Sequence, residues 1–308
     1  MQSVRLRGNL VTIVSMAMWA TTFPVTEIIL ETWHPVLVTG ARVLIAGAFL
    51  ALWMALAGRL GELRTAPWAS GMLVGGVGLT GASLCLVWGL QFSDPVTASI
   101  IAATVPLIAA IMGVASRTER LTVPISVGIV LAIGGGIVTS WRDDVELLGF
   151  HGGEALVILG NVFWVWYSRG CIHRLAALSD LAKTTLTTLC CSVVVLALIV
   201  AFLATGWVPA ELDLSLPTLS LIFWMAAIAN GASVVFWLWG ARLLGVTIGS
   251  MHQNLVPFYV MLMVLPLGGE LHTQQLFGGT LVVAGAILAQ LPWRRGWPAW
   301  RRLYTKSN

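Results

Sequence analysis

The sequence predicts an all-α polytopic membrane protein, with ten transmembrane helices arranged as two inverted five-helix repeats around a central cavity. Three observations predict this class: the apolar composition, the spacing of long apolar segments, and an internal repeat. Apolar residues make up 58% of the 308 residues and charged residues 10%, with a mean hydropathy of +0.90. A soluble domain usually has about a quarter charged residues, so the composition excludes that class.

Ten apolar segments are each long enough to cross a bilayer as a helix, which takes about 20 residues. Lipid offers the backbone no hydrogen-bond partners, so we expect these segments to be helical. The connections between them are short and leave no room for a soluble domain. The predicted spans are residues 9–30, 34–57, 68–91, 94–115, 123–141, 152–171, 181–204, 215–241, 246–267 and 275–292.

The second half of the chain repeats the first at an offset of 151 residues. Ten of the fifty residue pairs between 88–137 and 239–288 are identical, where roughly four are expected by chance. Each repeat holds five spans, and an odd number turns the second repeat upside down. We expect the first repeat over 1–142, the second over 143–292, and a basic cytoplasmic tail over 293–308. Inverted repeats around a midplane site are typical of secondary transporters.

Basic residues gather on one side of the predicted topology. If the N-terminus is cytoplasmic, 15 of the 17 Lys and Arg residues fall in inner segments, which agrees with the positive-inside rule. Both termini are then cytoplasmic, in a bacterial inner (plasma) membrane. The net charge of +4 reflects this topology rather than binding to nucleic acid. The expected partners are membrane lipid and a small-molecule substrate, and we expect the protein to act as a monomer.

Polar side chains inside the spans are costly in lipid and are expected to face an interior. In the first span Ser15, Trp19, Thr22 and Thr26 share one helix face. Similar stripes lie on spans 3, 4, 6, 8 and 9, whereas spans 5, 7 and 10 carry none that is comparable. The candidate substrate-binding residues are Trp19, Thr22, Thr80, Ser83, Ser99, Asn161, Trp164, Asn230, Ser233, Trp237, His252 and Asn254.

Each of these residues also has a structural interpretation. Ser and Thr in such helices can bond back to their own carbonyl groups, and Asn can join helices. Arg42, inside span two, could hold a substrate carboxylate, or pair with a helix-end carbonyl or with Glu27. Pro106 and Pro257 occupy matching places in spans four and nine, as hinges or as fixed kinks.

Cofactor chemistry finds no support in the sequence. Cysteine, histidine and carboxylate residues show no spacing that resembles a closed metal site. The four cysteines lie within spans or near the inner face, and we expect no disulfide. We expect no metal, no cofactor and no enzymatic activity.

Span one contains a Trp-x-x-x-Phe element (Trp19, Phe23), span two an internal arginine (Arg42), and a Thr-Glu-Arg-Leu turn (Glu119, Arg120) precedes span five. With these features the chain resembles a known family, the EamA type of the drug/metabolite transporter superfamily. The similarity covers about residues 8–292 and includes a small polar start of span four and a Gly-rich fifth span. The second half repeats the pattern, although Ser168 lies opposite Phe23 and Leu271 follows Glu270. The residues that carry the resemblance are Trp19, Phe23, Arg42, Pro106, Glu119, Arg120, Trp164, Pro257 and Glu270.

Within that family the chain is most similar to the YddG-type bacterial exporters of aromatic amino acids. The resemblance implies an inner-membrane carrier with ten helices and a central cavity. The two departures bear on whether both halves play equal roles, and not on the fold.

These observations favour a secondary transporter that exports small amphipathic metabolites, above all aromatic or other apolar amino acids. Trp19 and Trp164 would stack on the apolar part, and the polar candidates Asn161, Asn230, His252 and Asn254 would hydrogen-bond the zwitterionic end. A multidrug or cationic-compound exporter is the closer alternative, yet it would favour a deep carboxylate. A sugar-phosphate carrier would need more than one buried cation. An intramembrane enzyme would need a pair of deep Asp residues, an H-E-x-x-H motif, or a Ser with a His at matching depth, and the spans show none of these.

Overall fold

The structure is a computed structural model that describes residues 2–116, 123–139, 152–206, 212–268 and 270–290. Over these ranges every regular element is a helix. The first half contains α1 (Gln2–Ala20), α2 (Thr22–Leu30), α3 (Pro35–Leu56), α4 (Gly61–Arg64), α5 (Trp68–Gly71), the π-helix η1 (Met72–Leu79), α6 (Thr80–Gln91), α7 (Pro95–Ala102), α8 (Val105–Ala115) and α9 (Val123–Thr139). The second half contains α10 (Gly153–Arg174), α11 (Asp180–Ala204), α12 (Leu216–Phe223), the π-helix η2 (Trp224–Ala232), α13 (Ser233–Leu244), α14 (Val246–Gly249), the 3₁₀-helix η3 (Ser250–Leu255), α15 (Val256–Val264), the 3₁₀-helix η4 (Leu265–Leu267) and α16 (Thr273–Gln290).

Helical segments lie at the positions of all ten predicted spans. Within the described ranges seven are long and apolar enough to cross a membrane, which fits a polytopic membrane protein. The other three positions hold α9, the α14–η4 segment and α16, so the count of ten spans stays a prediction. Glu119, Arg120 and the predicted tail over 293–308 lie outside the described residues. The seven long segments are Val4–Leu30, Pro35–Leu56, Trp68–Gln91, Pro95–Ala115, Gly153–Arg174, Asp180–Ala204 and Leu216–Leu244.

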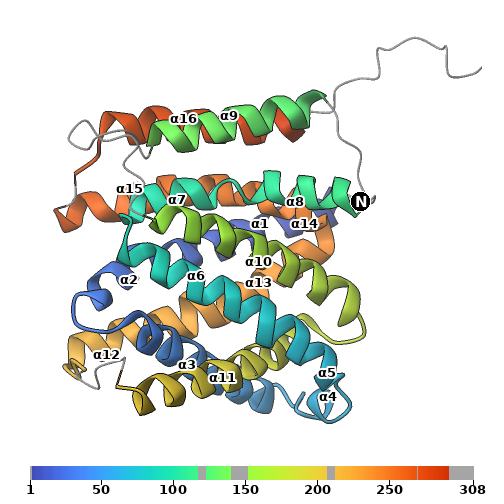
Figure 1. The fold of residues 1–308 in the computed structure, drawn as a ribbon. Coiled ribbons are helices and arrows are strands. Elements are labelled where there is room, and N and C mark those ends of the chain that lie inside the picture. The colour runs from blue at the N-terminus through green and yellow to red at the C-terminus, as the bar shows by residue number, and fades with distance from the viewer. Residues whose placement is uncertain (1, 117–122, 140–151, 207–211, 269, 291–308) are drawn as a thin grey trace, which may run out of the picture.

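The helices run roughly side by side in stacked layers (Figure 1). The pair α9 and α16 forms one side of the molecule, and α3 and α11 form the opposite side. The N-terminus, α4 and α5 lie at one end of the bundle, and α12 lies at the other. The end with the N-terminus carries Arg5, Arg7, Arg59 and Arg64, which the topology prediction places in the cytoplasm.

The contacts between helices come in pairs that relate the two halves. Span one packs on span eight through α1 and α13, and span six packs on span three through α10 and α6. In the same way η2 contacts α3, while η1 contacts α11. The contacts of α3 with α11 and of α9 with α16 join matching spans. An exchange of the two halves therefore leaves this contact pattern unchanged.

Breaks in the helices recur at matching places too. Spans three and eight both pass through a π-helix, η1 and η2. Span four is interrupted between α7 and α8, directly before Pro106, and span nine becomes the 3₁₀-helix η3 directly before Pro257. A proline has no N–H to donate to the preceding turn, so the helical hydrogen-bond ladder is interrupted there.

Glycines let the helices approach closely, as small residues do in membrane bundles. A Cβ atom added at Gly75 in η1 would lie 2.2 Å from the backbone oxygen of Thr187 in α11. One added at Gly135 in α9 would lie 2.6 Å from the backbone oxygen of Gly278 in α16. Packing of this kind fixes η1 against α11 and α9 against α16.

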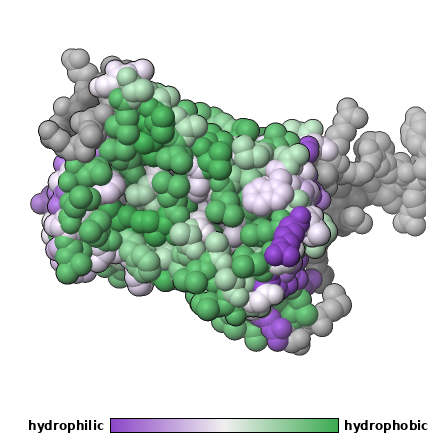
Figure 2. All heavy atoms as spheres, turned by 90° about the horizontal axis from the view of Figure 1, so that it is seen from below, coloured by the Kyte–Doolittle hydropathy of each residue, from purple (hydrophilic) through white to green (hydrophobic). Residues whose placement is uncertain are grey.

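The outer surface is apolar over its middle. Figure 2 shows a broad hydrophobic belt on the side of α3 and α11, with hydrophilic residues toward the ends. The exposed apolar side chains of these two helices include Leu44, Leu52, Val193, Leu196 and Val200. Such a belt suits a lipid environment.

Candidate substrate-binding cavity

A small cavity lies between the middle parts of five spans. Its lining comes from α1, α3, the junction of η1 with α6, α10, and η2. The cavity has a volume of about 20 Å³, which is room for a water molecule and not for a metabolite. The lining residues are Trp19, Arg42, Leu79, Ala82, Ser83, Leu86, Val157, Gly160, Asn161, Trp164 and Asn230.

Two tryptophans from repeat-related spans stack beside this cavity. The rings of Trp19 and Trp164 lie 6.3 Å apart between centroids, with an interplanar angle of 9°. Phe23 meets Trp19 edge to face, and Trp237 and Tyr167 lie against Trp164 at 5.8 and 5.4 Å. The predicted aromatic pair is therefore the centre of a buried aromatic cluster.

The indole nitrogens in this cluster differ in what they bind. Trp237 donates from Nε1 to Ser168 Oγ at 3.0 Å, whereas Trp164 Nε1 is buried and has no partner. Trp237 is fully buried behind Trp164 and does not line the cavity. The indole N–H of Trp164 is therefore a donor that remains available beside the cavity.

Arg42 brings a buried positive charge to the cavity wall. Its side chain is 3% exposed, and Nη2 lies 3.4 Å from Ser83 Oγ, at the long end of the hydrogen-bond range. The Nε and Nη1 atoms are buried without a partner. Over the described ranges the ion pairs join Arg59 with Glu62 and Asp180 with Lys183 and Arg242, and none of them involves Arg42.

Asn161 joins the cavity to the break in span four. Its Nδ2 donates to the carbonyl of Ile101 at 3.0 Å and lies 3.4 Å from Thr104 Oγ1. The Ile101 carbonyl, at the break between α7 and α8, also accepts from the backbone N–H and the hydroxyl of Thr104. Asn161 thus binds two helices together, as one of its two interpretations predicted, and still lines the cavity beside Asn230.

Several predicted residues lie away from the cavity, and most bond to a helix backbone. Ser99 donates to the carbonyl of Val96, and Ser233 to that of Ala229. Thr80 lies within bonding distance of the Gly75 carbonyl and of Cys191 Sγ. Thr22 is fully buried, and its Oγ1 has no partner. Of the four, only Thr22 keeps an unused polar atom.

The polar run of span nine lies in η3, outside the cavity lining. His252 approaches the carbonyl of Gly249 through Nδ1 at 3.1 Å and is half-buried. Asn254 is 5% exposed, and its Oδ1 is buried without a partner. The neighbouring Gln253, which the sequence analysis did not select, is fully buried with neither amide atom partnered. The structure therefore does not bring His252 and Asn254 to the tryptophans.

Span seven corrects one expectation. The sequence analysis found no polar stripe there, yet α11 buries a run of hydroxyl side chains. Thr184, Thr185 and Thr187 donate to carbonyls four residues back, and Ser192 also donates to the Val43 carbonyl. Because these hydroxyls are used within the bundle, α11 has a structural polar stripe and no lining role.

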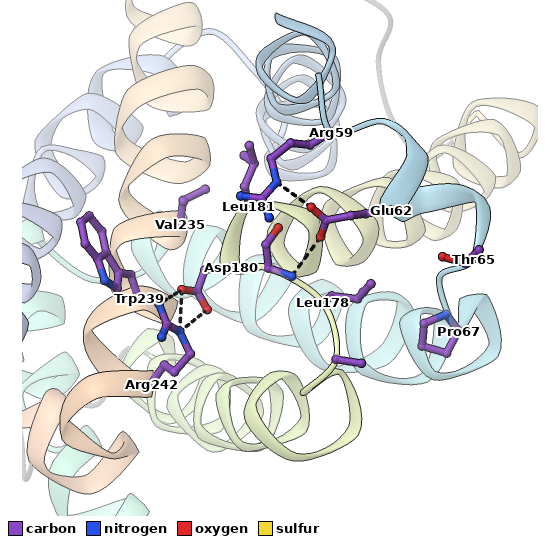
Figure 3. Close-up of a pocket in the computed structure, with 12 residues that line it drawn as sticks. Arg59, Glu62, Thr65, Pro67, Leu178, Asp180, Leu181, Val235, Trp239 and Arg242 are labelled. Carbon is purple, nitrogen blue, oxygen red and sulfur yellow. Dashed lines mark hydrogen bonds and ion pairs between the residues drawn. The ribbon is translucent and has the colours of Figure 1, made fainter. Parts of the chain in front are cut away.

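A second pocket opens at the end that carries α4. It has a volume of about 730 Å³ and lies between the α3–α5 connection, the start of α11 and α13 (Figure 3). Glu62 accepts from the Ser179 N–H at 3.0 Å and from Arg59 Nε at 2.6 Å, while Asp180 faces Arg242. These carboxylates connect a loop of the first half and a helix of the second to the start of α11.

Burial and hydrogen bonding have opposite effects on the pKa of Glu62 in this pocket. Burial raises the pKa of this carboxyl, but hydrogen bonds from the backbone and hydroxyl of Ser179 and the contact with Arg59 lower it more. The net shift is downward, which favours the charged form. The wall of the pocket includes Leu181 and Val235, which also belong to an apolar cluster with Leu50 and Met54. The pocket is thus a polar surface feature with an apolar wall.

Comparisons with known proteins agree with this architecture. Residues 6–141 match the EamA-like transporter family. An uncharacterized transporter of Bacillus subtilis (strain 168), YyaM, is 25% identical over 221 residues, which is 71% of this chain and 72% of that protein. One solved crystal structure, 20% identical, matches with a TM-score of 0.68 over 99% of both chains. At that identity the likeness speaks for the fold alone. The chain is a multi-pass membrane protein, and its match to EamA-like transporters supports a membrane transporter of that superfamily.

Proposed function

We propose that the protein is a secondary transporter that exports small amphipathic metabolites, above all aromatic or other apolar amino acids. The observation that carries the proposal is the stacked pair Trp19 and Trp164, which faces the same cavity as Asn161 and Asn230. Aromatic faces suit an apolar side chain, and amides suit the polar end of an amino acid. The protein then needs no cofactor and carries out no covalent chemistry.

The proposed mechanism is alternating access between two inverted repeats of five spans each. The proposal counts α9, the α14–η4 segment and α16 as the fifth, ninth and tenth spans, with both termini on the cytoplasmic side of a bacterial inner membrane. The exchangeable contact pattern supports the repeat, as do the paired breaks. The offset of 151 residues also places Glu62, after span two, on Asp213, after span seven. Glu62 accepts from the N–H of Ser179 before span seven, and the Asp213 carbonyl accepts from Trp33 before span two, so these two contacts also exchange between the halves.

The cavity must widen before a substrate can bind. Small-molecule sites usually have volumes of about 300–1,000 Å³, far more than the 20 Å³ here. Carbon atoms in contact lie about 3.5–4.0 Å apart, so a ring held between two indoles needs about 7–8 Å between their planes. The centroids of Trp19 and Trp164 lie 6.3 Å apart. Binding between them therefore requires the two helices to separate, and the closed cavity corresponds to an occluded state.

Cationic-compound export fits the lining less well. The described lining contains the cation Arg42 and no Asp or Glu, and a buried cation repels a cationic substrate. The proposal for amino acids therefore stands ahead of its closest alternative.

Counterflow of radiolabelled amino acids in liposomes tests the proposed function. We expect accumulation of phenylalanine or tryptophan, and a strong loss in Trp19→Ala and Trp164→Ala, because each removes aromatic area worth on the order of 1 kcal/mol or more in binding. Trp68→Ala is the matched control, because Trp68 is 44% exposed and lies far from the cavity lining. If both cavity variants transport like wild type, the tryptophans only pack.

Energy coupling is tested in the same liposomes. Spans 3, 4, 8 and 9 carry no Asp or Glu at the depth of their polar stripes, so we propose a facilitator or exchanger. Downhill flux should persist without a pH gradient and in His252→Gln. Uphill accumulation that needs the gradient and is abolished in His252→Gln would make His252 the coupling residue instead.

A further inference from the structure

Arg42 is a buried cation whose bonding capacity is largely unused. A guanidinium has five N–H donors in a fixed planar fork. Here the only described contact is the 3.4 Å approach of Nη2 to Ser83, while Nε and Nη1 are buried and unpartnered. The side chain lines the central cavity rather than a helix end. Neither structural alternative for Arg42, a bond to a helix-end carbonyl or an ion pair with Glu27, is found among the described contacts.

An unpaired buried charge of this kind is strongly unfavourable. Removing an ion from water without a partner costs several kcal/mol even after relaxation, and arginine does not escape the cost by losing its proton. Ionisable residues inside the membrane are therefore expected to mark a substrate or ion pathway. The missing counter-charge must come from outside the described lining, and the cavity is the space that Arg42 shares with Trp19 and Trp164.

We propose that Arg42 binds the carboxylate of the transported substrate. This inference rests on the proposed function and narrows it. Nε and Nη1 are the unused donors, and a planar carboxylate can accept from the guanidinium fork through two oxygens. Ser83 lies beside the fork, and the two tryptophans supply the apolar surface of the same cavity.

The proposal also assigns unequal importance to the two charged groups of an amino acid. The described lining offers a cation for the carboxylate and no carboxylate for the ammonium group, which meets only neutral acceptors such as Asn161, Asn230 and Ser83. A charge-assisted hydrogen bond is stronger than a neutral one. The substrate class is thus a small carboxylate with an apolar or aromatic group, and the ammonium group is not essential.

Competition between matched probes tests this assignment. In wild-type liposomes, phenylalanine counterflow should be inhibited by phenylalanine and by 3-phenylpropionate, which has only the carboxylate. It should not be inhibited by phenethylamine, which has only the amine, or by inorganic phosphate. In Arg42→Gln, inhibition by both carboxylates should weaken about tenfold or more. Arg42→Lys keeps the charge but not the planar fork, and its inhibition by the carboxylates should lie between that of wild type and that of Arg42→Gln. Arg174 is an exposed residue at the end of α10, and Arg174→Gln should be inhibited like wild type.

Thermal shifts of the purified protein in detergent provide a second measurement that does not depend on transport. 3-Phenylpropionate should raise the melting temperature of wild type and Arg174→Gln, and not that of Arg42→Gln. Equal effects of the amine and the carboxylate on wild type would overturn the assignment, as would an Arg42→Gln variant that still prefers the carboxylate. A carboxylate-dependent shift without any amino-acid counterflow would reject the proposed function alone.

Discussion

Spans four and nine occupy matching places in the two halves but satisfy their broken helices differently. Before Pro106, the Ile101 carbonyl accepts from Thr104 and from the Asn161 amide of span six. Before Pro257, the Gln253 carbonyl accepts from the Val256 N–H, but the two buried side-chain amide atoms of Gln253 have no partner. Buried side-chain amide atoms without partners gain from a rearrangement that supplies them, whereas the bonded groups at the break before Pro106 have no such gain. We infer that span nine moves more than span four.

Spans three and eight show the same kind of difference. Both contain a π-helix at the middle, which often marks a functional position. At the 151-residue offset Gly75 of η1 corresponds to Ala226 of η2. Gly75 packs against the backbone of α11 so closely that a methyl group does not fit, while Ala226 already carries one and is fully buried. The two halves share a path through the membrane, and their packing is not interchangeable.

The largest effect is expected from Gly75→Ala. Its new Cβ would lie 2.2 Å from the oxygen and 2.6 Å from the Cα atom of Thr187. Both are backbone atoms that cannot turn aside, so we expect a loss of about 3 kcal/mol in the free energy of unfolding. Ala226→Gly, the matched change in span eight, should cost only about 1 kcal/mol. Thermal unfolding in detergent measures both, and equal effects would show that the two π-helices pack alike.

Asn161→Leu should have a smaller effect. The change removes the amide that bonds to the Ile101 carbonyl, and this carbonyl keeps its contacts with Thr104. The expected loss is therefore that of one hydrogen bond, about 1 kcal/mol. Unfolding by heat or denaturant checks the value. An unchanged stability would mean that the Asn161 hydrogen bond does not stabilise the break in span four, and would remove the contrast with span nine.

Gln253→Leu should not reduce stability at all. Neither amide atom has a partner to lose, and replacing an unsatisfied polar group by an apolar one of similar size is neutral or stabilising. Transport should nevertheless fall if these atoms find partners in another state of the cycle. Melting temperature and counterflow are measured on the same preparation. A clear drop in stability would show that Gln253 is already satisfied, for instance by a buried water.

The sequence predicted where the helices run better than how they are interrupted. Long apolar segments must be helical in lipid, so the seven long spans follow from composition and length. The π-helices η1 and η2 contain no proline and depend on packing against α11 and α3. Breaks that stand close to a proline, such as those before Pro106 and Pro257, do have a local signal. The contacts that set the others join residues far apart in the chain.

For the cavity residues, the residue type and the helix face could be predicted from the sequence. The depth of each residue in the bundle and the rotation of each helix could not. Trp19, Ser83, Asn161, Trp164 and Asn230 were selected from their polar stripes, and all five line the cavity. Ser99 and Ser233 lie on similar stripes, yet their hydroxyls bond to their own helices. A stripe shows which face of a helix is polar. It does not show whether the polar side chains on that face bond to a backbone carbonyl or line a cavity. The missing partners of Gln253 are a property of the packed structure and leave no local signal.

The smallest effect concerns acid stability and compares the matched carboxylates Glu62 and Asp213. Hydrogen bonds from Thr218 and Ser215 lower the pKa of Asp213, and the contacts described above lower the pKa of Glu62. A lowered pKa contributes stability that is present above the unfolded value, near 4, and is lost as the pH falls through the folded value. Melting temperatures should therefore decline from about pH 5 downward. Glu62→Gln should flatten this decline more than Asp213→Asn. The Glu62 carboxylate bonds to Ser179 in the other half of the chain, whereas the Asp213 carboxylate bonds only to Ser215 and Thr218, within five residues of itself. If Asp213→Asn flattens the curve as much, the two carboxylates hold their loops equally, and this difference between the halves disappears.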